Sequence, residues 1–166
     1  MVANEIESGE RDGAVGDHLI AFARRMLPRF ALVAVERDDP IVLILLNRYR
    51  RLHGMAPGPV AGHGWKGVTF DGKIVCVYAD TWADGKVALV ENVCPANSRY
   101  GRLAVYALLV FYRLAYERGE IAGFIVSVLA TNEAMQRAIG RVFEGLGPLD
   151  ARGLPVPHSV VYKLGV

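Results

Sequence analysis

The spacing of hydrophobic positions along the chain changes several times, and each change predicts a new structural element. From residue 65 the pattern has a period of two, and the segments 65–70, 73–80 and 86–95 are typical of strands. The Asp71-Gly72 pair supplies the positive φ angles that a tight hairpin turn requires, and TWADG provides a second turn. Three consecutive antiparallel strands are therefore predicted in the middle of the chain.

The segments before these strands carry one strand pattern between two helical patterns. Asp17 suits the cap of a short amphipathic helix, HLIAFARRML, that ends near Pro28, and residues 29–38 alternate weakly, as a strand does. Pro40 suits the first turn of a second helix, which closes with basic residues and Gly54. The β-branched start of that segment leaves a strand as the alternative there.

The last third of the chain alternates helices with strands. The stretch NSRYGRLAVYALL opens a long apolar helix that Gly119 ends. Residues 121–129 are almost continuously apolar, which predicts a strand buried on both faces. Thr131 or Asn132 caps a further helix that runs to about Glu144, and HSVVYKL is the final strand.

Composition fits one folded unit. The chain has 166 residues, of which 52% are hydrophobic and 22% charged, and this is enough to bury a substantial core. We expect residues 1–14 to be a polar arm and residues 15–166 to form a single domain. The polar, acidic start lacks the features of a secretory signal, and no apolar run could span a membrane. We therefore expect a soluble, cytoplasmic protein.

Neither the net charge nor the spacing of His and Cys residues favours a nucleic-acid, membrane or metal partner. The net charge of +2 is too small to indicate nucleic acid or an anionic membrane, and the basic run RYRR suits the C-terminus of a helix. No pair of His or Cys residues has metal-ligand spacing, so we expect no metal site. Cys76 and Cys94 lie in predicted strands, where buried thiols are favoured over a disulfide.

The stretch NSRYGRLAVYALL carries the most chemical information, because a strand runs there through a turn into a helix. The first turn of a helix has unpaired N–H groups and the positive end of the helix dipole, which together attract anions. We assign donor amides to residues 99–103, expect Gly101 to let a pyrophosphate approach closely, and expect Arg99 and Arg102 to add positive charge. The alternative is a glycine that only ends a turn, beside solvated arginines.

The predicted order of elements over residues 30–164 is strand, helix, three-strand meander, helix, strand, helix, strand. This order resembles the GNAT fold of acetyl-CoA-dependent N-acetyltransferases. The resemblance implies an α/β domain with a mixed, mainly antiparallel sheet and helices on both faces.

Two local motifs add to the resemblance. In that family a loop of the form Q/R-x-x-G-x-G/A opens the central helix, and Ser98, Gly101 and Leu103 occupy its three defined positions here. Asn132 matches an asparagine at a strand end, and the sequence FEGLG at 143–147 resembles the ending Tyr-Glu-x-Leu-Gly. Ser98 and Leu103 depart from the motif, and the branched side chain of Leu103 stands where a smaller residue would leave more room.

The resemblance implies acetyl-CoA as a co-substrate bound at this loop. The implied binding residues are Val93, Ser98, Arg99, Tyr100, Gly101, Arg102, Leu103 and Asn132. Phe143 stands near the position of the family's thiolate-protonating tyrosine and has no hydroxyl group.

Direct transfer from a thioester to an amine needs a base for the ammonium proton and a donor for the leaving thiolate. Glu91 stands where the family often keeps a base, and strand alternation places it on one face with Leu89 and Val93. A structural or exposed carboxylate is the other interpretation of Glu91. Tyr100 and Tyr106 lie near the loop and are the candidate proton donors, with packing as the alternative role.

The resemblance implies an acyl-CoA-dependent N-acyltransferase that acts on a small-molecule or protein amine. A GNAT-fold structural or assembly protein without catalysis is the first alternative, and a nucleic-acid-modifying relative is the second. The helix from residue 99 is apolar around most of its circumference, which requires cover by the N-terminal helix, by residues 41–46 or by another subunit. We expect intramolecular cover together with a homo-oligomer.

Overall fold

The computed structural model describes residues 18, 20–62, 64–143 and 159–165 of the chain. The expected polar arm at 1–14, the Asp17 cap and the helix end at Glu144 lie outside the described residues, as does most of the FEGLG sequence.

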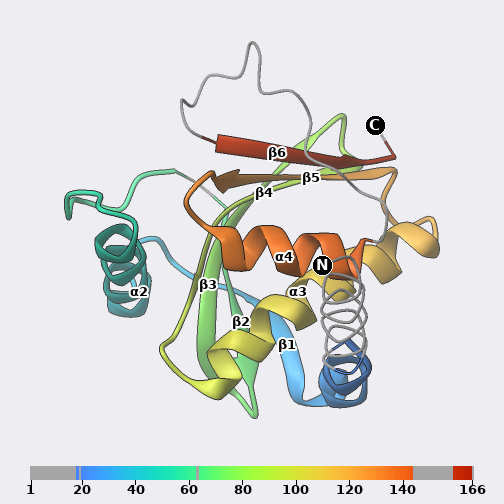
Figure 1. The fold of residues 1–166 in the computed structure, drawn as a ribbon, viewed down its shortest axis with the longest axis horizontal. Coiled ribbons are helices and arrows are strands. Elements are labelled where there is room, and N and C mark those ends of the chain that lie inside the picture. The colour runs from blue at the N-terminus through green and yellow to red at the C-terminus, as the bar shows by residue number, and fades with distance from the viewer. Residues whose placement is uncertain (1–17, 19, 63, 144–158, 166) are drawn as a thin grey trace, which may run out of the picture.

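Six strands form one sheet in the order β1-β2-β3-β4-β5-β6 (Figure 1). Neighbouring strands are antiparallel except for β4 and β5, which are parallel. This confirms the predicted mixed, mainly antiparallel sheet. The strands are β1 (Phe30–Ala34), β2 (Trp65–Phe70), β3 (Lys73–Ala83), β4 (Val87–Pro95), β5 (Gly123–Leu129) and β6 (Ser159–Leu164).

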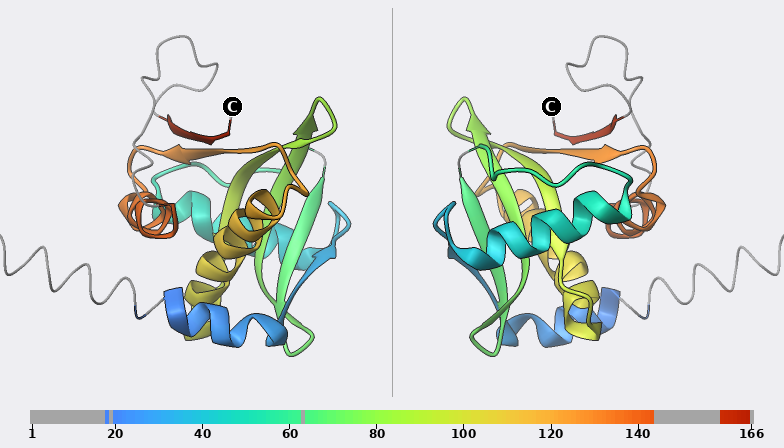
Figure 2. Two further views of the ribbon diagram at one scale, coloured as in Figure 1. Left: turned by 90° about the vertical axis from the view of Figure 1, so that its right-hand side faces the viewer. Right: turned by 90° about the vertical axis from the view of Figure 1, so that its left-hand side faces the viewer.

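Helices cover both faces of the sheet, as Figures 1 and 2 show. Helix α2 (Pro40–Leu52) packs on one face, and α3 (Arg99–Glu117) and α4 (Glu133–Val142) pack on the other. We call these the α2 face and the α3 face. A short helix over residues 20–26 and the 3₁₀ turn η1 (Leu27–Arg29) precede β1 and lie against α3. None of the described helices is long and apolar enough to cross a membrane.

The segment that could have been helix or strand is helix α2. Asp39 caps it, because its carboxylate accepts a hydrogen bond of 3.0 Å from the Ile41 amide. Pro40 occupies the first turn, where its missing N–H costs nothing. Capping and burial of one helix face outweigh the β-branched start.

The hairpin turns follow the prediction, but β3 is longer than expected. Asp71 and Gly72 both have positive φ, at 49° and 83°. The prediction ended β3 at Asp80, whereas β3 continues to Ala83 because it stays paired with β4 as far as Ala83↔Val87.

The apolar circumference of α3 is covered from within the chain. Leu108, Leu109 and Val110 are fully buried, and the core around them includes α4 and residues 20–27. Helix α3 therefore does not require cover by another subunit, and the homo-oligomer stays a prediction.

Strand β5 is less buried than its sequence predicts. Its alternate residues are buried on the α3 face, but Ile125 and Ser127 are only half-buried on the α2 face. The prediction of burial on both faces is therefore wrong, because α2 packs on β3 and β4 and leaves this part of β5 partly open.

Strands β4 and β5 separate halfway along their length. Their pairing begins at Val87↔Gly123 and ends at Val90↔Val126. Beyond that point β4 continues along β3 to Pro95, whereas β5 continues along β6. We call the space between the diverging ends the split.

A β-bulge in β4 accompanies the separation. Ala79 pairs with Glu91 and Val77 pairs with Cys94, so β4 contains one more residue than β3 between these pairs. Asn92, in the bulge, has a positive φ of 51°. A bulge bends its strand and re-aims the side chains beyond it, and this one lies at the start of the split.

A buried polar cluster fixes α3 beside the start of the split. Asp80 pairs with Val90 and is only 4% exposed. Its carboxylate accepts hydrogen bonds from Lys66 Nζ at 2.7 Å and from the Tyr112 hydroxyl at 2.9 Å. These contacts join β2, β3 and α3 through one buried charge. Among the described residues the buried hydroxyl of Tyr78 has no partner.

Replacing Asp80 with alanine should lower the free energy of unfolding by about 3 kcal/mol. The variant leaves the Tyr112 hydroxyl buried and unpaired, and it leaves the Lys66 ammonium group without its carboxylate partner. Glu117→Ala is the matched control, since Glu117 pairs with Arg113 on an exposed helix surface at 2.8 Å and should change stability by about 0.5 kcal/mol or less. Denaturant unfolding measures both. Equal losses for the two variants would contradict this role of Asp80.

Candidate functional site

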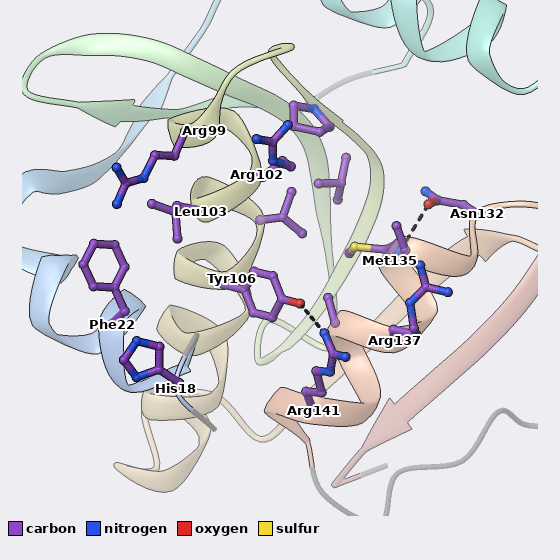
Figure 3. A pocket seen from close by; sticks show the side chains of 15 residues that line it. His18, Phe22, Arg99, Arg102, Leu103, Tyr106, Asn132, Met135, Arg137 and Arg141 are labelled. Carbon is purple, nitrogen blue, oxygen red and sulfur yellow. Dashed lines mark hydrogen bonds between the residues drawn. The ribbon is translucent and has the colours of Figure 1, made fainter. Parts of the chain in front are cut away.

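A cavity of about 530 Å³ lies on the α3 face and reaches the split (Figure 3). Val93 and Pro95 of β4 line its inner end together with Asn132, which precedes α4. Helices α3 and α4 form its two sides, and His18 and Phe22 line its outer part. The cavity therefore extends from the sheet to the helix that precedes β1.

The first turn of α3 opens beside this cavity, but only part of it is free to bind an anion. Ser98 is the cap of α3, and its hydroxyl accepts a hydrogen bond of 3.0 Å from the Gly101 amide. The Arg102 amide donates to the Ser98 carbonyl at 3.1 Å. Within the described residues, the amides of Arg99 and Tyr100 have no partner. Of the donors predicted at residues 99–103, these two remain.

Gly101 lies against another part of the backbone. It is buried, and a Cβ atom built on it would lie 2.1 Å from the carbonyl oxygen of Ala96. The backbone between β4 and α3 therefore passes directly against Gly101. Close approach of the chain to itself is enough to explain a glycine here, and the predicted approach of a pyrophosphate stays a prediction.

Four arginines line the cavity, and no acidic side chain of the described residues does. Arg99 and Arg102 come from α3, and Arg137 and Arg141 come from α4 (Figure 3). Arg141 donates a hydrogen bond of 3.2 Å to the Tyr106 hydroxyl across the cavity. This concentration of positive charge makes the cavity suited to an anionic ligand.

The remaining cavity residues that the sequence suggested take different positions. Leu103 is 6% exposed and lines the cavity as part of its wall, so it does not fill the space. Tyr100 stacks on Phe70 with ring centroids 4.3 Å apart, and its side chain does not line the cavity. Asn132 caps α4, because its side-chain oxygen accepts a hydrogen bond of 3.2 Å from the Met135 amide.

Glu91 lies on the opposite side of the split. It pairs with Ala79, which belongs to the core of the α2 face, and it is exposed. Alternation predicted that Glu91 and Val93 share a face, but Val93 belongs to the core of the α3 face. The extra residue at Asn92 reverses the alternation, and this part of the prediction is wrong.

The last turn of α2 joins both sides of the split. Arg48 donates a hydrogen bond of 2.8 Å to the Pro95 carbonyl at the end of β4. His53 Nδ1 lies 3.1 Å from Thr131 Oγ1, just beyond β5. Burial lowers the pKa of His53, which favours the neutral ring.

Tyr49 of α2 lies between these two contacts. It packs in the core of the α2 face with Cys94 of β4 and is only 9% exposed. Burial raises the pKa of its phenol to about 12, although a hydrogen bond with the Asn132 side chain acts in the opposite direction. The phenol is therefore protonated at neutral pH and faces residues from both sides of the split.

Neither a protein-family model nor a curated protein matches the chain. Solved structures do match it. An acetyltransferase from Thermus thermophilus is 13% identical, with 82% of this chain and 96% of that chain covered and a TM-score of 0.58.

Two further structures agree. An acetyltransferase of the GNAT family from Bacillus anthracis is 13% identical, covers 82% of this chain and 94% of its own, and has a TM-score of 0.53. The ribosomal-protein-S18-alanine N-acetyltransferase from Escherichia coli is 16% identical, covers 81% and 92%, and has a TM-score of 0.53. The chain has the GNAT fold.

On this GNAT fold the basic run RYRR has structural partners. Arg48 holds the end of β4, and Arg50 donates to the carbonyls of Gly58 and Pro59 at 2.7 and 3.1 Å. These bonds attach α2 to the loop that follows it. The run therefore gives no specific support for nucleic-acid binding.

The cysteines are buried free thiols, as predicted. Burial raises the pKa of Cys94 to about 12, and burial also raises the pKa of Cys76. A thiol with so high a pKa is a poor nucleophile, so Cys94 gives no support for a covalent route. No group of metal-binding side chains gathers within the part of the chain that the structure describes.

Sequence reasoning missed Arg137, Arg141 and Tyr49. The two arginines are four residues apart on α4 and so share one face, which is a signal that the sequence does contain. Nothing in the sequence near Tyr49 indicates its position, because α2 reaches the split only through the fold of the whole sheet.

Gly101→Ala should destabilise the protein by about 2 kcal/mol or more, because the new methyl group would overlap the Ala96 carbonyl. Gly140→Ala is the matched control: no atom lies within 4 Å of a Cβ there, so alanine should stabilise α4 by about 0.5–1 kcal/mol. Thermal and denaturant unfolding distinguish the two. A neutral Gly101→Ala would show that the loop is free to move away.

Proposed function

We propose that the chain is an acyl-CoA-dependent N-acyltransferase that transfers an acetyl group from acetyl-CoA to an amine. One observation carries this proposal: the split connects an arginine-lined cavity on the α3 face with an exposed carboxylate, Glu91, on the α2 face. A donor and an acceptor could therefore meet in the split from opposite faces of the sheet.

The cavity residues fit the anionic half of the donor. The unpaired amides of Arg99 and Tyr100 and the positive end of the α3 dipole suit a diphosphate. The guanidinium groups of Arg99 and Arg102 supply charge-assisted hydrogen bonds at the same place. A volume of about 530 Å³ falls in the usual range for sites that take a ligand of this size.

The split fits the pantetheine arm. Beyond Val90, the edge of β4 that faces β5 has no strand paired with it in the described residues. Such an edge offers backbone N–H and C=O groups to an extended ligand that carries amides. Val93 and Pro95 add an apolar surface there.

The residues around the split could supply the proton transfers. Acyl-CoA, when bound, supplies an acyl group activated by its bond to sulfur. Glu91 accepts a proton from the ammonium form of the acceptor, which frees the amine lone pair for bonding to the acyl carbon. Tyr49 donates a proton to the sulfur as the carbon–sulfur bond breaks, and solvent restores it. The Tyr100 side chain stacks on Phe70 and does not line the cavity, so in this proposal Tyr49 replaces Tyr100 as the proton donor to the thiolate.

A GNAT-fold protein without catalysis is the second candidate. It is favoured by Phe143, which is buried against Phe124 with ring centroids 5.2 Å apart and brings no hydroxyl group to α4. Ser98 and Asn132 also use their side chains as helix caps. Binding of acetyl-CoA without turnover on any amine would favour this structural role.

Acetyl-CoA should bind the wild-type chain, and Arg102→Gln should weaken binding about 10- to 100-fold, the size expected for a lost charge-assisted hydrogen bond. Isothermal titration calorimetry measures both. Arg118→Gln removes the same charge from an exposed position beside Glu120 and should bind normally. No heat of binding with the wild-type chain would reject the donor site.

Turnover should depend on Glu91 and Tyr49. With a panel of small amines and peptide N-termini, thiol release from acetyl-CoA should fall about 100-fold in kcat for Glu91→Gln and for Tyr49→Phe. The Kd for acetyl-CoA should stay within about two-fold, because neither residue lines the cavity. Unchanged kcat in either variant would remove that residue from the mechanism.

A further inference from the structure

We infer that the outer side of α2 binds a second copy of this chain, with the two α2 helices packed in opposite directions around a twofold axis. An apolar contact forms the centre of this interface, and an ion pair forms at each end. The inference goes beyond the proposed function, because the surface that it concerns lies outside the donor cavity.

The first observation is an excess of exposed apolar side chains on and directly after α2. Seven large hydrophobic side chains are exposed among the described residues, and four of them lie between residues 43 and 55. Ile44 is 61% exposed and lies on the side of the helix opposite to the buried Val42 and Tyr49. In the right-hand view of Figure 2, α2 lies in front of the sheet and no other helix or strand covers it. Apolar side chains gathered in this way mark an interaction site.

The side of α2 that faces away from the sheet changes in character along the helix. At helical spacing it consists of Pro40, Leu43, Ile44, Asn47 and Arg51, which we call the outer stripe. The stripe begins with three apolar residues and ends with a cation. The Asn47 side-chain oxygen already accepts hydrogen bonds from Arg50 at 3.2 Å and from the Gly58 amide at 3.3 Å, so it does not need water when the stripe is buried.

The second observation is the opposite charge at the two ends of the outer stripe. Arg51 lies at its C-terminal end, whereas Glu36 and Asp38 lie in the segment directly before α2, and all three are exposed. Within the described ranges none of the three forms an ion pair. The neighbouring Arg48 and Arg50 differ from Arg51, because they donate to backbone carbonyls of the same chain.

These charges are self-complementary under a twofold axis. Arg51 follows Ile44 by seven residues and Asp38 precedes it by six, so both lie about two helical turns from Ile44. Two antiparallel α2 helices that meet at Ile44 therefore bring Arg51 of each copy to Asp38 of the partner subunit, and the helix dipoles then oppose each other as well. Leu43 and Ile44 of both copies pack at the axis. A parallel arrangement would instead place like charges together.

The same charges favour a second copy over a membrane surface. Glu36 and Asp38 lie directly before the apolar part of the outer stripe, where an anionic lipid headgroup would be repelled. A contact made by one helix of each copy lies at the small end of specific interfaces, so we expect a weak dimer with a Kd of about 1–100 µM.

Sedimentation velocity of the full chain from about 1 to 500 µM measures this association. The wild-type chain should pass from monomer to dimer. Ile44→Glu should stay monomeric with an unchanged thermal unfolding curve, because Ile44 is exposed in the monomer. Trp82→Glu is the matched control: Trp82 is 46% exposed on β3, and this variant should dimerise like the wild-type chain.

Two results would overturn the inference. One is a wild-type chain that stays monomeric over the whole range; if it also binds vesicles containing phosphatidylserine and Ile44→Glu does not, the apolar patch belongs to a membrane contact. The other is a dimer that forms equally well with Ile44→Glu, because the interface then lies elsewhere on the molecule.

Charge reversal tests the antiparallel orientation. Arg51→Glu and Asp38→Arg should each weaken the dimer about ten-fold or more, because both ends of the interface then carry like charges. An equimolar mixture of the two variants should associate about as tightly as the wild-type chain, because a mixed pair has opposite charges at both ends. If the mixture associates no better than the separate variants, the proposed packing of α2 on α2 is wrong.

Discussion

The extra residue of β4 at Asn92 keeps the end of β4 on β3, while β5 stays on β6, so two parallel strands that begin as neighbours are pulled apart. Strand edges are normally satisfied by another strand, and among the described residues a stretch of backbone past Val90 lacks one. The polar cluster around Asp80 fixes β3 and α3 next to this point. The first turn of α3, the cavity and Glu91 all take their places from the divergence, because each lies on one side of the split or at its end.

Charged side chains are distributed unevenly in the molecule, and the small net charge does not reveal this. The net charge is only +2, yet four arginines and, within the described ranges, no carboxylates line one cavity. Like charges brought together in a partly enclosed space repel one another, and water screens them less there than on an open surface. A polyanionic ligand would remove this repulsion and complete the hydrogen bonds of the guanidinium groups.

Local sequence signals predicted most of the fold and part of the site. Asp71-Gly72 fixed a hairpin because positive φ angles are a property of the residues themselves. Asn132 and the start of α3 were predictable from capping for the same reason. The contact between Gly101 and Ala96 was not predicted, because it depends on the path of the chain that brings Ala96 back against the glycine. A glycine motif indicates that some group approaches the backbone closely, but it does not indicate whether that group is a ligand or another part of the chain.

The wrong prediction for the face of Glu91 and the failure to predict roles for Arg141 and Tyr49 have the same cause: both depend on how distant segments pack. Alternation along β4 fails at the bulge, and nothing in the local sequence clearly signals the extra residue. Arg141 lines the cavity only because α4 packs beside α3, and Tyr49 reaches the split only because α2 packs on the other face of the sheet. The positions of both residues therefore depend on contacts between distant segments.

On the α2 face, the last turn of α2 covers the end of the split that lies between Pro95 and Thr131. This cover restricts the route that an acceptor could follow. Arg48 attaches α2 to the end of β4, and His53 attaches it to Thr131 beyond β5, so the last turn of α2 lies across that end. The inner part, beside Glu91 and the half-buried Ser127, is less covered. An acceptor would therefore approach where the strands first diverge, next to the carboxylate that could take its proton.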